Sequence, residues 1–92
     1  MKVADDQLRA AVRTLGGYGA QRVLLFGSYL HAPEGARDID LAVQGIPLSR
    51  LLDADLALYK TFRTSFDLVS REEDPAFFDL IRTEARVLYE ES

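Results

Sequence analysis

The spacing of apolar residues switches between a helical and a strand period along the whole chain, and this alternation limits the possible folds more than any other feature. No internal repeat or low-complexity linker interrupts it. With 92 residues, 48% of them hydrophobic, we expect residues 1–92 to form a single domain with one core. The predicted fold class is α/β (α+β), with a small mixed sheet of at least three strands covered by about four helices.

The expected elements follow from apolar spacing and from helix-start and helix-stop residues. Strands are predicted over about 21–26, 37–43 and 65–69, and helices over about 4–15 and 47–62, with a short helical turn within 29–36. A last helix is predicted from near Asp74-Pro75 through Tyr89. The helix over 47–62 should carry an apolar stripe made of Leu48, Leu51, Leu52, Leu56 and Tyr59.

Composition excludes several classes of protein. Without cysteine the chain has no disulfide, zinc-thiolate site or thiol nucleophile, and one histidine cannot form a histidine-rich metal cluster. A net charge of −4 has the wrong sign for a protein that binds nucleic acid directly. Because the amino terminus is acidic and no apolar run approaches about 20 residues, we expect a cytoplasmic protein without membrane contact.

Two aspartates mark the second predicted strand. Side chains alternate along a strand, so Asp38 and Asp40 should share one face, with attachment points roughly 6–7 Å apart. Such a pair can converge on one hard cation or bridge two, and Mg²⁺ fits it better than zinc. The alternative is a half-exposed edge strand with two solvated acids.

Two further features could complete a site around that pair. Gly27-Ser28 ends the first strand, where a glycine and a hydroxyl residue let backbone N–H groups approach a phosphate, although an ordinary capped turn has the same sequence. Asp67 lies in an otherwise apolar strand, where aspartate is disfavoured. If its strand neighbours that of Asp38 and Asp40, Asp67 completes a three-carboxylate cluster; otherwise it is a solvent-facing edge residue.

The ordered set Phe26-Gly27-Ser28, Asp38-Ile39-Asp40 and Phe66-Asp67-Leu68 resembles the minimal nucleotidyltransferases of the polymerase-beta-like superfamily, the antitoxins of HEPN/MNT toxin–antitoxin pairs. The resemblance covers nearly the whole chain. It implies a polymerase-beta-like nucleotidyltransferase core. It also implies nucleotidyl transfer with ATP as substrate and a HEPN-domain toxin as partner, silenced by AMPylation of a tyrosine.

The resemblance also assigns roles to individual residues. Gly27 and Ser28 would bind the phosphates of the nucleoside triphosphate. Asp38 and Asp40 would bind two magnesium ions, and Asp67 would be the third metal ligand and the base. A substrate hydroxyl would then attack the α-phosphate in line and release pyrophosphate.

One departure from the family pattern keeps a second function open. Many relatives carry basic residues just after Gly-Ser, where this chain has residues 29–32, Tyr-Leu-His-Ala. His31 or Arg37 could supply part of the missing charge. The alternative function is a weak or inactive enzyme that neutralises its partner by binding alone.

The length leaves no room for a separate substrate-binding domain, so the acceptor site should come from a partner protein or a second copy of the chain. The expected contact surface lies on the last predicted helix. Packing of this helix on the sheet is the alternative explanation for its apolar residues. It comprises Phe77, Phe78, Leu80, Val87 and Tyr89.

Overall fold

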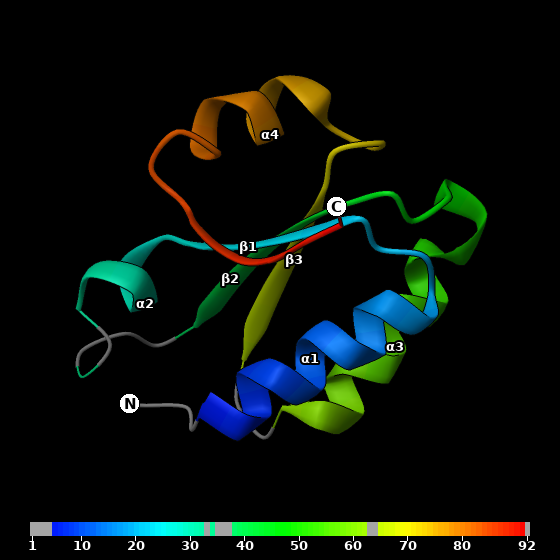
Figure 1. The fold of residues 1–92 in the computed structure, drawn as a ribbon, viewed down its shortest axis with the longest axis horizontal. Helices are drawn as coiled ribbons and strands as arrows, with labels where there is room; N and C mark the ends of the chain where they lie inside the picture. Colours follow the sequence, from blue (N-terminus) through cyan, green and yellow to red (C-terminus); the bar gives the residue numbers. More distant parts are fainter. Residues whose placement is uncertain (1–4, 33, 35–37, 63–64, 92) are drawn as a thin grey trace.

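The computed structural model describes residues 5–32, 34, 38–62 and 65–91. Within them the chain forms a four-stranded mixed sheet and four helices, which confirms the predicted fold class (Figure 1). The elements in chain order are α1 (Asp5–Gly17), β1 (Arg22–Phe26), α2 (Ser28–His31), β2 (Ile39–Gln44), α3 (Leu48–Thr61), β3 (Phe66–Ser70), α4 (Pro75–Ile81) and β4 (Arg86–Glu90).

The strand order of the sheet is β3-β2-β1-β4. The central strands β1 and β2 are antiparallel, β4 is antiparallel to β1, and β3 runs parallel to β2. β1 has the central place that its uninterrupted apolar run predicts, and its three middle residues are buried. The strand β2 is central as well, so Asp40 does not belong to an edge strand, and Asp38 directly precedes β2.

Helices cover the two faces of the sheet unequally. Figure 1 shows α1 and α3 on one side and α4 on the other. The larger core lies beneath α1 and α3 and includes Ile39, Leu41 and Val43 of β2. A smaller cluster of Leu24, Ala42 and Phe78 lies beneath α4. The alternation predicted for β2 is therefore confirmed, and its even-numbered residues face α4.

The last predicted helix is wrong beyond residue 81. α4 begins as expected, with Pro75 at its start and the Asp74 side chain accepting a hydrogen bond from the Phe77 backbone N–H at 3.1 Å. The chain then turns, and Arg86–Glu90 forms β4 instead. A short apolar run fits the period of a helix as well as that of a strand. Residues 86–90 form a strand because the buried strand β1 needs hydrogen-bond partners on both sides.

The apolar stripe predicted on α3 is not the face of the helix that the core buries. Its buried residues are Ala54 and Leu58, which pack into the larger core. Four of the five residues of the predicted stripe lie on the outside, with exposed fractions of 57% for Leu48, 68% for Leu52, 55% for Leu56 and 75% for Tyr59. We call these four residues the α3 stripe. None of the described helices is both long enough and apolar enough to cross a lipid bilayer.

Candidate functional site

Two carboxylates meet where β2 and β3 run side by side. The parallel register pairs Asp40 of β2 directly with Asp67 of β3. Asp40 shares its face with Ala42, which is buried beneath α4, so the acidic pair lies on the α4 face of the sheet. The strand of Asp67 therefore lies next to the strand of Asp40, as the predicted carboxylate cluster requires. Asp67 is exposed and β3 is an edge strand, so it is open to a ligand.

Gly27 brings the end of β1 against the same carboxylate. The antiparallel register pairs Phe26 with Asp40, and Gly27 follows directly. Its φ is +79°, a backbone conformation that favours glycine. A Cβ at this position would overlap Asp40 Oδ2 and lie 2.9 Å from Asp40 Cγ. The sequence motifs Gly27-Ser28 and Asp38-Ile39-Asp40 therefore meet at one point, although nine residues separate them in the chain.

The electrostatics of the site centre on Asp40. Burial raises the pKa of its carboxyl above the usual 3.8, and the negative charges of Asp67 and Asp38 raise it further. A hydrogen bond between the Asp40 and Asp67 side chains acts in the same direction, because it favours the protonated form of Asp40. The three acids predicted from the sequence therefore interact. The Asp38 side chain is half-buried, two residues before Asp40.

A groove of about 510 Å³ opens beside this acidic cluster. It lies between the end of β1, α2 and the end of α4, and the ring of Phe26 packs edge-on against Phe77 of α4 at 6.0 Å between centroids. Its lining combines apolar and polar side chains. The lining residues are Phe26, Gly27, His31, Leu80, Ile81, Thr83 and Glu84.

The donor set of the site suits a hard cation. Asp40 and Asp67 offer carboxylate oxygens side by side, and their mutual repulsion would be relieved by a bound Mg²⁺. In the part of the chain that the structure describes, no three acidic or histidine side chains are grouped so that they could hold one metal ion together. The pair fits magnesium, which commonly takes one or two carboxylates together with substrate phosphate oxygens.

The structure brings together Gly27, Asp38, Asp40 and Asp67 from the predicted set. Ser28 is the first residue of α2, and Arg37 lies outside the described residues. His31 is exposed and lines the groove beside Gly27. Sequence reasoning missed Thr83 and Glu84 at this groove, because the turn that brings them there was assigned to a continuous helix.

The contact surface predicted on one long helix is not a single face. Phe78 is only 1% exposed and forms the core beneath α4, while Val87 and Tyr89 belong to β4. Phe77 and Leu80 are exposed on α4. The apolar residues that do form a continuous exposed row are those of the α3 stripe.

We compared the sequence with protein-family models and with curated proteins, and no match was found in either comparison. The resemblance to minimal nucleotidyltransferases therefore rests on the motif residues alone.

Proposed function

We propose that the chain is a magnesium-dependent nucleotidyltransferase that moves AMP from ATP to a tyrosine hydroxyl of a HEPN-type toxin in the cytoplasm and so neutralises the toxin. One observation carries the proposal. Gly27 at the end of β1 packs against Asp40, which is itself paired with Asp67 on the next strand. A glycine turn for phosphate and a carboxylate pair for metal are thereby adjacent, as nucleotidyl transfer requires.

Each residue of the chain has a defined task in this reaction. Gly27, which has no side chain, lets a phosphate approach the backbone closely, and Ser28 would bind phosphate beside it. Asp38, Asp40 and Asp67 would between them hold two magnesium ions, which when bound stabilise negative charge on the attacking and leaving oxygens. Asp67, which is exposed, would accept the proton of the tyrosine hydroxyl. A bond forms between the tyrosine oxygen and the α-phosphorus, and the bond to the leaving pyrophosphate breaks.

The groove beside Gly27 offers a place for the rest of the nucleotide. Phe26, Leu80 and Ile81 provide apolar contact area of the kind that a base or a ribose covers. His31, Thr83 and Glu84 provide polar groups that can fix its orientation. Its volume of about 510 Å³ falls within the usual range of about 300–1,000 Å³ for small-molecule sites.

The direct test is intact mass analysis of the HEPN-type partner after incubation with the chain, ATP and magnesium. We expect the mass of one or more adenylyl groups with the wild type and none with the Asp38→Ala, Asp40→Ala double variant. The matched control is Asp53→Ala, Asp55→Ala, which removes two acids from α3, away from the site. An unmodified partner under conditions where the complex forms would contradict the proposal.

A second function, neutralisation by binding alone, is favoured by the α3 stripe. Four large apolar residues on one helix are more than 50% exposed, and such a row is typical of a surface that a partner covers. The two functions differ in a measurable way. If binding alone neutralises the toxin, the Asp38→Ala, Asp40→Ala variant should neutralise as well as the wild type, whereas variants of the α3 stripe should fail.

A further inference from the structure

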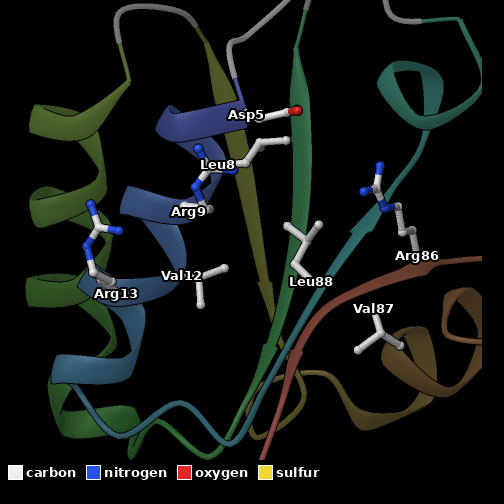
Figure 2. Close-up of a pocket in the computed structure, with 8 residues that line it drawn as sticks. All are labelled: Asp5, Leu8, Arg9, Val12, Arg13, Arg86, Val87 and Leu88. Atoms are coloured by element: carbon white, nitrogen blue, oxygen red, sulfur yellow. The ribbon is translucent and has the colours of Figure 1, made fainter.

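A second groove, of about 390 Å³, lies between α1 and the edge strand β4 (Figure 2). Its apolar residues include Leu8 and Val12 of α1 and Leu88 of β4, which all contact the larger core. Leu88 is packed against the α1 face of the sheet, whereas Asp40 lies on the α4 face. The groove is therefore separate from the candidate active site, and nothing in the proposed reaction uses it.

Positive charge is concentrated at this groove in a chain whose net charge is −4. Arg9 and Arg13 line it from α1, and Arg86 lines it from β4 (Figure 2). Among the described residues, no carboxylate forms an ion pair with any of the three guanidinium groups, although Asp5 also lines the groove. Arg9 and Arg13 are four residues apart on one helix, where like charges repel each other. An anionic ligand would relieve that repulsion.

The strand beside the groove has a free side. Within the described part of the sheet, β4 is hydrogen-bonded only to β1, so its outer backbone N–H and C=O groups face no other strand. Val87 is 52% exposed on this strand. An edge of this kind pairs readily with an extended peptide, whose backbone supplies affinity and whose alternate side chains supply specificity.

We propose that the α1–β4 groove binds an extended acidic segment of a partner protein, which adds a strand beside β4 and places carboxylates against Arg9, Arg13 and Arg86. Charge complementarity identifies the occupant: three arginines that pair with no carboxylate of the described residues select a negatively charged chain. The apolar floor of Leu8, Val12 and Leu88 favours a peptide with alternating apolar and acidic side chains over a free phosphate, which needs no such floor.

The same charges argue against a second copy of this chain as the occupant. Pairing of two β4 strands about a two-fold axis would bring the same surface of both copies together. The grooves of the two copies would then adjoin, so the like charges of Arg9 and Arg13 would be doubled at one surface, which is unfavourable. An acidic partner has no such penalty.

Fluorescence anisotropy with a short labelled peptide in which glutamate and valine alternate tests the proposal. We expect saturable binding to the wild type and a loss of about tenfold or more in the Arg9→Gln, Arg13→Gln, Arg86→Gln variant. The charge-matched control is Arg50→Gln, Arg71→Gln, Arg82→Gln, which removes three exposed arginines elsewhere and should lose less than about threefold. An N-methylated version of the peptide, which cannot pair with a strand edge, should bind about tenfold more weakly.

Several results would overturn the proposal. They are the absence of saturable binding, equal binding of a peptide with lysine in place of glutamate, and equal losses in the two triple variants. Full displacement of the peptide by millimolar inorganic phosphate would identify an anion site without strand pairing. A dimer in sedimentation that Arg86→Glu strengthens or dissociates would identify a second copy as the occupant. Circular dichroism of each variant shows that it is folded.

Discussion

The Asp40 carboxylate occupies the space that a side chain at position 27 would fill. Gly27 has a φ of +79°, and a Cβ there would lie 2.9 Å from Asp40 Cγ. The glycine therefore serves the conformation of the turn and the position of the carboxylate at the same time. This contact joins β1 to β2 at the centre of the candidate site, and it can be tested independently of any activity.

Replacing Gly27 should destabilise the fold and displace Asp40. We expect Gly27→Ala to lower the free energy of unfolding by about 2–4 kcal/mol, from the positive φ and the clash with the carboxylate together. Gly16→Ala is the matched control, since it lies in α1 with no atom within 4 Å of an added Cβ, and it should stabilise by about 0.5–1 kcal/mol. Urea denaturation measures both, and similar effects of the two variants would refute the contact.

Asp40→Asn should stabilise the protein at neutral pH. The folded-state pKa of Asp40 is raised above 3.8, so its contribution to stability is fully present below that pH and is lost as the pH rises through the raised pKa. The amide carries no charge and escapes that loss. After discounting for solvent screening, we expect a gain of about 0.5 kcal/mol, or about 2–4 °C in melting temperature, at pH 7.

The pH dependence of this gain is the diagnostic result. Thermal melts of wild type and Asp40→Asn should converge below pH 3.8, where the wild-type carboxyl is protonated as well. Asp53→Asn, at an exposed position on α3, is the control and should shift the melting temperature little at either pH. A gain for Asp40→Asn that persists unchanged at acid pH would show that repulsion within the carboxylate cluster is not its cause.

Magnesium should stabilise the wild type through the same carboxylates. A ligand present at ten times its Kd stabilises the folded state by about 1.4 kcal/mol, which for a domain of this size raises the melting temperature by roughly 6–10 °C. The Asp40→Asn, Asp67→Asn variant should lose this response, while Asp53→Asn should retain it. Differential scanning fluorimetry with and without MgCl₂ makes the comparison, with NaCl at equal ionic strength as the reference. Equal shifts in all three proteins would indicate non-specific binding to an acidic chain.

Local patterns in the sequence were enough to predict the meeting of Gly27 and Asp40, whereas the place of Asp67 beside them was conditional. An uninterrupted apolar run predicted the central strand β1, and strict alternation placed Asp40 opposite the larger core. Both signals are periodicities of the chain itself, and the packing in the structure agrees with both of them. What the sequence left conditional was the adjacency of β2 and β3, because strand order depends on contacts between segments far apart in the chain.

The carboxyl-terminal region could not be predicted from its own periodicity. Residues 86–90, Arg-Val-Leu-Tyr-Glu, fit a helical face as well as a strand, and the second open side of β1 decides between them. The Arg22–Glu90 ion pair at 3.2 Å and the hydrogen bond from Glu91 N–H to the Gln21 carbonyl at 2.8 Å then fix the end of β4 beside β1. Neither partner is near in sequence, so no local pattern indicates the pairing.

The α3 stripe yields a prediction that separates partner binding from stability. Apolar periodicity identified a face of α3 without indicating whether the chain itself covers it, and the structure leaves Leu52 and Leu56 exposed at 68% and 55%. Leu52→Glu, Leu56→Glu should therefore change the free energy of unfolding by less than about 0.5 kcal/mol for each substitution. Leu58→Ala, on the buried face of the same helix, should cost about 2–5 kcal/mol.

The same double variant should abolish binding to a HEPN-type partner if the α3 stripe is the contact surface, because two charges would be buried without partners. Size-exclusion chromatography of the mixed proteins measures complex formation, and urea denaturation measures stability in parallel. Retained binding by Leu52→Glu, Leu56→Glu would exclude the stripe as the interface and remove the main support for neutralisation by binding alone. Lost stability instead of lost binding would show that the stripe contributes to the fold itself.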